Sequence, residues 1–453
     1  MKKINPPSHY TQTASQRLIK LVVEEVQAPL SIKWWIIFVV CCAIAFRGLG
    51  VSSWQMASEG VGVLGVNNHV PWGWDIVHFV FWIGLGHAGT LISSVLLLTR
   101  QPWRSPIARG AELMTLCAVI CAGIFPVVHV GRIWMGWMTA PLPEVSGVWS
   151  NLGSPLMWDV LAVSTYFCLS ISYWYMGLIP DFALLRDACT GKRKWWYGLF
   201  ALGWKGTSTQ WYVYEKSSLI FAAILTPLVI SVHSVVSFDF AVTVNAGWHE
   251  TLYPPYFVIG AMLSGMAMVI LILVCVKKLM GESVRVAITA RVMNLASKLL
   301  LTLSLLMGFM YLWEHLCGLM QSENVTELLH AKNQEWGGWA MWLMIVGNVL
   351  IPQCLWFNKV RRSAWCLVLV SLSVLGGMWL ERFLIVVGSL KQSFLWGQCG
   401  DYLPTTTDVW MFVGSAGLFV CLYMVLVRLT PFFSLCELRE MIISRKDEQA
   451  NEK

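Results

Sequence analysis

Ten apolar stretches of about twenty residues, separated by short polar connectors, run from residue 34 to residue 429. A helix rises about 1.5 Å per residue, so about twenty apolar residues cross roughly 30 Å of hydrocarbon. The backbone polar groups of such a stretch must be satisfied within it, which favours helices. We predict an all-α integral membrane protein with about ten transmembrane helices, at Trp34–Gly50, Gly73–Thr99, Ala108–Met135, Pro155–Gly177, Val213–Val244, Pro255–Val276, Val292–Leu319, Trp336–Phe357, Trp365–Gly388 and Asp408–Leu429.

The composition agrees with this class. The 453 residues are 57% hydrophobic and 13% charged, which is about half the charged fraction of soluble domains. The first 30 residues are polar and show no apolar region ahead of a small-residue cleavage site, so we expect no removable signal peptide. The net charge of +7 comes from basic residues in the connectors. We therefore expect these residues to face membrane lipids and not to bind nucleic acid.

The basic residues favour one side of the membrane. Of the 32 Lys and Arg residues, 25 lie in or beside the two terminal segments and the even-numbered connectors, whereas the odd-numbered connectors hold only Lys332 and Lys391. Connectors rich in Lys and Arg stay on the cytoplasmic side. One span added or missing would exchange the sides of all later connectors and remove this asymmetry. We therefore expect both termini to be cytoplasmic.

The cysteines do not suggest a bound metal. The 13 cysteines form no C-x-x-C, C-x-x-C-H or ferredoxin spacing, which are the patterns of iron–sulfur clusters and c-type haems. We expect no haem, no iron–sulfur cluster and no other metal site in this chain. His87 lies mid-span among small residues in FWIGLGHAGT, so we expect it to bridge two helices by a hydrogen bond, with ligation of a b-type haem as the alternative.

Ionisable side chains gather near the outer ends of four consecutive spans. Counting residues from the outer end of each span places them at one level, roughly 5 to 15 Å below the outer surface. Charges at that depth cost on the order of a few kcal/mol each unless they pair or reach water, so they are candidates for function. The group consists of Asp75 and His78 in the second span, His129 and Arg132 in the third, Asp159 in the fourth, and His233 and Asp239 in the fifth.

This combination fits the oxidation of a lipid quinol. The reaction needs an apolar slot, hydrogen-bond partners for two hydroxyls, and bases that take two protons as two electrons leave. Histidine titrates near neutral pH, and a buried carboxylate supplies a second base. We assign catalysis to His129, Asp159 and Asp239, and quinol binding to Arg132, Trp158, His233, Ser237, Asp75 and His78. For each residue alone, a helix-end group, a structural ion pair or a snorkelling side chain is the alternative.

The second half of the chain repeats the pattern more weakly. Glu314 and His315 lie at the outer end of the seventh span, and Glu381 and Arg382 in the outer part of the ninth. Glu381 and Arg382 are adjacent, so we expect them to point to different sides of their helix and not to pair. We favour a structural or proton-conducting role for these residues over a second quinone site.

A proton path from the cytoplasm is a further hypothesis. Protons released at the outer level leave directly to that side, so quinol oxidation alone does not require such a path. The residues expected to relay protons are Glu112, Ser164, Thr165, Tyr173 and Glu215 in the first half and Glu314 and His315 in the second.

Six segments between residues 74 and 257 resemble the NrfD/PsrC superfamily of quinone-interacting membrane subunits, and within it the ActC branch of alternative complex III. They are WDIVHFVFWIGLGHAGTLIS, AGIFPVVHVGRIW, SPLMWDVLAVSTYF, YMGLIPDFALLRD, SVHSVVSFDFAV and GWHETLYPPYF. The family's histidine in the third helix and aspartates in the fourth and fifth fall on His129, Asp159 and Asp239. One departure is Ile133 in HVGRIW, where the family pattern has a proline after the arginine.

The resemblance implies two four-helix bundles, with peripheral first and last helices and the quinol site in the first bundle. The expected divisions are residues 1–72 (first helix and outer connector), 73–244 (first bundle), 245–388 (second bundle) and 389–453 (last helix and tail). It further implies a bacterial inner membrane, menaquinone or ubiquinone as substrate, an extrinsic iron–sulfur subunit on the outer face, c-type cytochrome subunits, a homologous second membrane subunit and a terminal oxidase. Outer connectors 141–153 and 246–254 are candidate docking surfaces.

Three other interpretations compete with quinol oxidation in alternative complex III. A quinone-reactive anchor of a molybdopterin enzyme, of the polysulfide reductase type, would use the same site with a different partner. A secondary transporter would more often show broken helices and mid-membrane sites, whereas these charges lie at the outer level. A purely structural anchor would leave the outer histidine and aspartates without a purpose.

Overall fold

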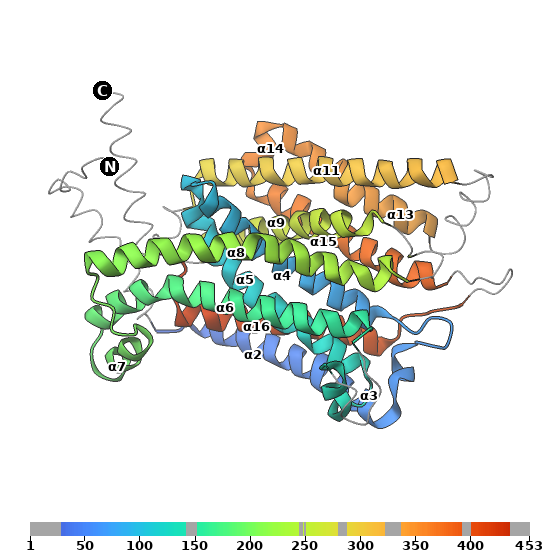
Figure 1. The fold of residues 1–453 in the computed structure, drawn as a ribbon, viewed down its shortest axis with the longest axis horizontal. Helices are drawn as coiled ribbons and strands as arrows, with labels where there is room; N and C mark the ends of the chain where they lie inside the picture. Colours follow the sequence, from blue (N-terminus) through green and yellow to red (C-terminus); the bar gives the residue numbers. More distant parts are fainter. Residues whose placement is uncertain are drawn as a thin grey trace.

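The computed structural model describes residues 29–141, 152–243, 248, 251–279, 288–321, 337–391 and 400–434. Within these residues the chain is helical and contains no strand. Ten of the described helices are long and apolar enough to cross a membrane. Figure 1 shows them lying roughly along one long axis, as expected for a multi-pass membrane protein. The prediction of an all-α integral membrane protein with about ten spans is confirmed.

The spanning helices and their connecting elements follow one another along the chain. Their bounds are α2 (Ile32–Ala45), η1 (Phe46–Val51), α3 (Ser52–Glu59), η2 (Val61–Leu64), α4 (Trp74–Leu98), η3 (Pro102–Arg104), α5 (Ser105–His129), η4 (Ile133–Thr139), α6 (Pro155–Ala188), α7 (Gly191–Phe200), α8 (Ser208–Ala241), α9 (Tyr253–Leu279), α11 (Ala290–Gln321), α13 (Gly337–Ile345), η6 (Val346–Leu350), η7 (Ile351–Trp356), α14 (Asn358–Arg362), α15 (Ala364–Phe383), η8 (Leu384–Gly388) and α16 (Thr406–Leu429).

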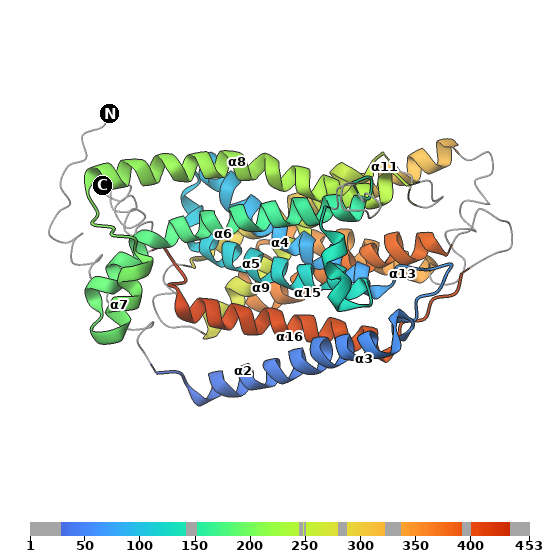
Figure 2. The ribbon, with the colours of Figure 1, turned by 60° about the horizontal axis from the view of Figure 1, so that its bottom comes forward.

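Helix α4 is the centre of the molecule and is buried along nearly its whole length. It packs against α5, α8 and α9, while α6 completes a first group with α5 and α8. Helix α9 packs against α11 and α15, and α13, η6 and η7 complete this second group. Helices α2 and α16 lie side by side at the periphery (Figure 2). Since α4 contacts α9 as closely as it contacts α8, the division into two four-helix bundles stays a prediction.

Small residues allow the central helices to approach closely. A Cβ atom at Gly89 of α4 would overlap with the carbonyl oxygen of Ala111 of α5 and lie 2.5 Å from Oγ1 of Thr115. A Cβ atom at Gly265 of α9 would overlap with Ala88 of α4. Close backbone contact of this kind replaces the hydrophobic driving force that helices lack inside lipid. The glycines therefore fix α4 between α5 and α9.

Several spans differ in length or regularity from the prediction. The first continues through the π-helical η1 to Glu59, and the eighth changes from α13 into π-helical η6 and 3₁₀ η7. Helices α6 and α8 each have 34 residues, or about 51 Å, and so exceed the roughly 30 Å hydrocarbon core. Part of each helix therefore lies beyond the hydrocarbon.

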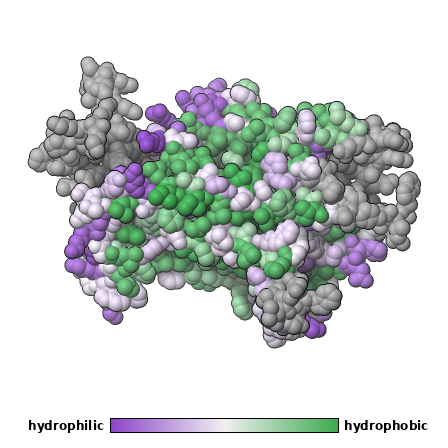
Figure 3. Space-filling model, in the orientation of Figure 1, coloured by the Kyte–Doolittle hydropathy of each residue, from purple (hydrophilic) through white to green (hydrophobic). Residues whose placement is uncertain are grey.

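The two ends of the long axis differ in charge. Figure 3 shows hydrophobic residues across the middle of one face and hydrophilic residues toward both ends. We call the end that carries Arg100, Lys192–Lys194 and Lys359–Arg362 the basic end, and the opposite end, which carries Asp75, His129 and Asp408, the site end. The candidate docking connectors at the site end fall mostly outside the described residues.

Candidate functional site

A hydrogen bond between two side chains joins α5 to α4 at the site end. His129 is the last residue of α5, and its Nδ1 lies 2.5 Å from Oδ2 of Asp75 in the first turn of α4. Asp75 is fully buried, whereas the His129 side chain is 21% exposed. A carboxylate only accepts hydrogen bonds, so His129 donates through Nδ1 and its Nε2 holds the lone pair. The pair therefore presents a base that a ligand can reach.

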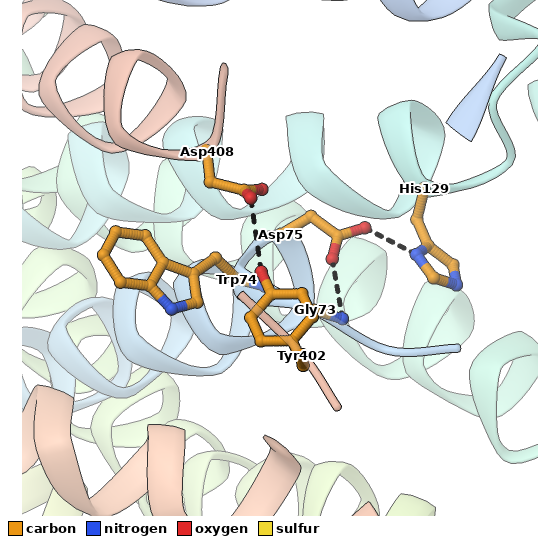
Figure 4. A network of polar contacts seen from close by, with 6 residues as sticks. All are labelled: Gly73, Trp74, Asp75, His129, Tyr402 and Asp408. Carbon is orange, nitrogen blue, oxygen red and sulfur yellow. Dashed lines mark hydrogen bonds and ion pairs between the residues drawn. The ribbon is translucent and has the colours of Figure 1, made fainter. Parts of the chain in front are cut away.

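Asp75 belongs to a network that includes the last helix (Figure 4). Its Oδ1 accepts a hydrogen bond from the Gly73 amide at 3.2 Å. The next amide, of Trp74, donates to the Tyr402 hydroxyl at 3.0 Å, and Tyr402 donates to Oδ2 of Asp408 at 3.3 Å. Burial and the neighbouring Asp408 carboxylate raise the pKa of Tyr402 above its usual value, so Tyr402 remains a donor. The start of α4 is thereby held from both sides.

Tyr402 and Asp408 were not predicted as parts of the site. A signal for Asp408 was present, because Thr405 and Asp408 form a capping box at the start of α16, at the outer level of the other carboxylates. Nothing in the sequence indicated that Tyr402 would reach the start of α4.

Asp159 of α6 and Asp239 of α8 form a second pair. Both side chains are buried, at 1% and 3% exposure, on two helices that pack against each other, and the carboxyl groups lie close enough for their charges to interact. Within the described chain, neither carboxylate oxygen of Asp159 has a conventional hydrogen-bond donor. Two carboxylates in contact away from water are stable together when they share a proton. This pair can therefore hold and release a proton.

Trp72 contacts His129 of the first pair and Phe240, the neighbour in sequence of Asp239. Its ring centroid is 6.3 Å from that of His129 and 5.8 Å from that of Phe240, the residue after Asp239. Trp248 packs against both Trp72 and Phe240. His129, Asp159 and Asp239 thus form two pairs beside a shared aromatic cluster and not one triad.

His78 points away from α6 and α8. It is fully buried and stacks on Phe412 of α16 at 4.7 Å, with Trp379 of α15 and Phe125 of α5 around it. Among the residues described, neither ring nitrogen of His78 has a hydrogen-bond partner. The structure therefore places His78 in the packing between the two helix groups.

His233 and His87 face one another in the buried centre. Their Nδ1 atoms are 2.8 Å apart, and Tyr166 packs edge-on against His87 at 4.6 Å. The predicted helix-bridging hydrogen bond of His87 is confirmed. His233 therefore contacts His87 of α4 and not the His129–Asp75 pair.

The remaining residues assigned to quinol binding lie at the site end with separate contacts. Arg132 is exposed, one residue after Gly131, whose φ of +80° turns the chain out of α5. The Trp158 indole donates to the Leu152 carbonyl at 2.7 Å. The Ser237 hydroxyl is buried and donates to the Ser234 carbonyl at 2.6 Å.

The residues expected to relay protons are divided between the interior and the surface. Glu112 is buried and accepts a hydrogen bond from Ser93 at 2.7 Å, and Tyr173 is buried beside Arg104 at 3.3 Å. Ser164, Thr165 and Glu215 are exposed. In the second group, Glu314 and His315 are half-buried on α11, where the His315 ring bonds the Tyr311 carbonyl at 3.1 Å.

The prediction that Glu381 and Arg382 do not pair was wrong. Nη1 of Arg382 lies 2.9 Å from Oε1 of Glu381, and both side chains are buried. Tyr311 donates a hydrogen bond to Glu381, and the Arg382 guanidinium lies 4.2 Å from the Phe257 ring centroid. Adjacent helical residues diverge at Cβ, but long side chains can turn back, and burial makes an unpaired charge far more costly than the bend.

Within the described ranges, no group of three or more His, Cys, Asp or Glu side chains could hold a metal ion. The side chains described at the site end supply bases, hydrogen-bond partners and aromatic rings.

Residues 62–393 match the family described as "Polysulphide reductase, NrfD". A protein of Halobacterium salinarum, provisionally named as a membrane subunit of dimethyl sulfoxide reductase, is 25% identical over 393 residues, covering 81% of each chain. A selenate reductase subunit of Mesobacillus selenatarsenatis is 22% identical over 423 residues, covering 88% of this chain and 94% of its own. The family match spans well over half of the sequence and includes both pairs at the site end, so this chain belongs to the NrfD polysulphide reductase family of membrane subunits.

Proposed function

We propose that this chain is the quinol-oxidising membrane subunit of a respiratory oxidoreductase complex. The observation that carries the proposal is the His129–Asp75 hydrogen bond, in which a partly exposed imidazole at the site end is held by a buried carboxylate. A quinol loses two protons and two electrons when it becomes a quinone. Nε2 of His129 is placed to take one proton, and the Asp159–Asp239 pair is a second acceptor, one aromatic cluster away.

The names of the relatives support this direction of the reaction. Both relatives are named as subunits of reductases, for dimethyl sulfoxide and for selenate. A reductase consumes electrons, so a membrane subunit that supplies them must oxidise quinol. The electrons then pass to an extrinsic iron–sulfur partner docked at the site end, which on this proposal faces away from the cytoplasm of a bacterium.

The two candidate complexes differ in partner and not in this chemistry. The names of the relatives favour a molybdopterin-type reductase, whereas alternative complex III would pair the chain with c-type cytochromes and a second membrane subunit. The intact complex, gently solubilised, should contain molybdenum and no c-type haem. Finding c-type haem without molybdenum would select alternative complex III instead.

The site is tested by single substitutions. His129→Ala or Asp159→Asn should lower quinol oxidation at least about tenfold while the complex still assembles, since one positioned base is lost. His315→Ala is the matched control, because His315 is an ionisable residue of the second group with its own carbonyl contact. Near-normal turnover in both site variants would remove the assignment.

A proton path through the first group is a second candidate function, supported by a series of buried polar contacts. From the basic end, Ser93 bonds Glu112, Thr90 bonds Thr115 at 3.1 Å, and both Thr115 and Tyr166 donate to the Gly86 carbonyl, at 2.7 and 3.0 Å. Tyr166 leads to the His87–His233 pair. The exposed residues Ser164, Thr165 and Glu215 have no place in this series.

The path predicts that Glu112→Gln lowers the number of protons moved per electron in reconstituted vesicles while quinol oxidation continues. Glu59→Gln, at an exposed carboxylate at the end of α3, is the matched control. An unchanged proton-to-electron ratio in Glu112→Gln would contradict the proton path. The protons released from quinol at the site end would then be the only ones that the complex moves.

A further inference from the structure

Helix α7 leaves much of its surface uncovered by the described chain. None of its 10 residues is buried, and Figures 1 and 2 both show it beside the end of α6 at the edge of the molecule. Phe182 of α6 stacks on Tyr197 with 5.9 Å between the ring centroids, and the Tyr175 hydroxyl donates to the Phe200 carbonyl at 2.8 Å. Tyr197 therefore marks the side of α7 that packs against α6.

Another side of α7 carries a continuous group of exposed apolar side chains. Trp195, Trp196, Leu199 and Phe200 recur at helical spacing and are 61%, 53%, 53% and 43% exposed. The two tryptophan rings are 4.8 Å apart, and Trp196 stacks on Phe200 at 6.2 Å. Leu202, just after the helix, is 66% exposed and extends the group. We call these five residues the α7 apolar face, and exposed apolar residues in mutual contact mark an interaction surface.

Basic residues precede the α7 apolar face. Lys192–Lys194 form the first turn of α7 and are all exposed. Between residues 183 and 206 the sequence has one acidic residue, Asp187, which is paired with Arg186 at 2.8 Å. The segment therefore presents an excess of positive charge beside its aromatic rings, which suits a partner with negative charges next to an apolar region.

The course of α7 places its apolar end toward the hydrocarbon and its basic end away from it. Helix α6 ends at Ala188, and α7 begins at Gly191 and returns along α6 until the Phe200 carbonyl meets the Tyr175 hydroxyl. Tyr175 lies about 30 Å along α6 from the first residue of that helix, which is the thickness of the hydrocarbon core. The apolar end of α7 thus lies at the edge of this core, and its first turn lies beyond it. Amphipathic helices with aromatic and basic residues occupy a membrane surface with this polarity.

We propose that α7 binds acidic phospholipids of the leaflet at the basic end. The α7 apolar face enters the boundary between headgroups and acyl chains, where tryptophan rings are favoured. Lys192–Lys194 hold lipid phosphates, because charged donors form strong hydrogen bonds to phosphate oxygens. The interaction fixes the end of α6, which extends past the hydrocarbon, to the membrane surface.

The charges favour an acidic lipid over a zwitterionic one. Phosphatidylglycerol carries a phosphate and no cation, so Lys192–Lys194 meet negative charge alone. Phosphatidylcholine adds a trimethylammonium group, which repels these residues and has no N–H to donate. We therefore expect α7 to bind a membrane that contains phosphatidylglycerol more tightly than one of phosphatidylcholine alone.

The test is hydrogen–deuterium exchange of the assembled complex in lipid nanodiscs, read by mass spectrometry on peptides that cover α7. A helix of 10 residues opens easily unless something holds it, so bound lipid should slow the exchange of its amides. Exchange should be at least about tenfold slower in phosphatidylcholine with about 30% phosphatidylglycerol than in phosphatidylcholine alone, since several basic residues add their attraction to an anionic surface. Equal exchange in the two lipids would overturn the proposal.

A charge variant tests the basic residues. Lys192→Gln, Arg193→Gln and Lys194→Gln together should remove the effect of phosphatidylglycerol on exchange in α7. The matched control removes the same number of exposed basic residues from separate segments of the basic end and should keep that effect: Lys33→Gln, Arg100→Gln and Lys359→Gln. The same loss in both triple variants would show a general charge effect and contradict a site on α7.

An apolar variant and a protein partner complete the test. Trp195→Ser with Trp196→Ser should speed exchange in both lipids, whereas Trp365→Ser, at another exposed tryptophan of the basic end, should not. Quinol oxidation should be unchanged in all these variants, because α7 lies at the opposite end from His129, and this shows that they fold. Fast exchange in both nanodiscs that slows only when a soluble protein is added would make α7 a protein docking surface and overturn the proposal.

Discussion

At the level of single residues, the His129–Asp75 pair explains how one histidine can act as a base at the edge of a membrane. The carboxylate fixes the Nδ1–H tautomer and directs Nε2 outward, and it stabilises the imidazolium that forms when a proton arrives. Asp75 is in turn held by the Gly73 amide, so the orientation of the ring depends on the start of α4. The base is therefore positioned by buried groups that need not touch the quinol.

Asp75→Asn keeps the size of the side chain but removes its charge. We expect quinol oxidation to fall about tenfold or more, since neither the tautomer nor the imidazolium is then supported. Asp408→Asn is the comparison, because Asp408 reaches the same region only through Tyr402. Steady-state turnover of the assembled complex measures both, and equal losses would argue against a special role for Asp75.

The buried Glu381–Arg382 pair is expected to affect the stability of the fold. Glu381→Gln leaves the Arg382 charge buried without its partner, and breaking a buried pair in this way costs about 3–5 kcal/mol. The double variant Glu381→Gln, Arg382→Met should recover most of that loss. Thermal unfolding in detergent is the measurement, and an unchanged midpoint in Glu381→Gln would show that the pair does not stabilise the fold.

Depth along a span could be predicted from the sequence, but contacts between residues could not. Counting residues identified Asp75, His129, Asp159 and Asp239 as groups of the outer level. The count gives no rotation about the helix axis, so it could not show that Asp75 pairs with His129 while Asp159 pairs with Asp239. It also gave no information on side-chain bending, which is why the Glu381–Arg382 pair was missed.

At the level of elements, the close contact of α4 with α5 depends on residues without side chains. Gly89→Ala should destabilise the protein by about 1–3 kcal/mol, because its methyl group would overlap with the Ala111 carbonyl of α5. Gly123→Ala on the exposed face of α5 is the matched control, since nothing lies within 4 Å of its added Cβ. A thermal unfolding series that shows equal midpoints for the two variants would contradict this account.

Hydropathy predicted the existence of all ten spans but not their internal irregularities. A span is set by the length of an apolar stretch, which the sequence shows directly. The π-helical segments η1, η6 and η8 depend on how neighbouring helices pack around them, which the local sequence does not encode. The lengths of α6 and α8 were underestimated. Hydropathy marks only the apolar stretch, and polar turns can extend a helix beyond it.

At the level of the whole molecule, the distribution of Lys and Arg makes a prediction about orientation in the membrane. The asymmetry of Lys and Arg predicts that the basic end faces the cytoplasm. A phosphatase reporter fused after residue 453 should be inactive, and the same reporter inserted in connector 392–399 should be active. The reverse result would place the site end in the cytoplasm and remove the proposed release of protons to the outside.

The last helix, α16, and the residues just before it contact the start of α4, although they lie outside the part of the chain that matches the family. The family match ends at residue 393, yet the Tyr402 hydroxyl accepts a hydrogen bond from the Trp74 amide, and Phe412 covers His78. A chain cut after residue 400 would keep every helix of the family segment and still lose the support behind Asp75. Grafting experiments between relatives should therefore exchange α16 together with α4, because the surroundings of Asp75 are built from segments more than 300 residues apart in the sequence.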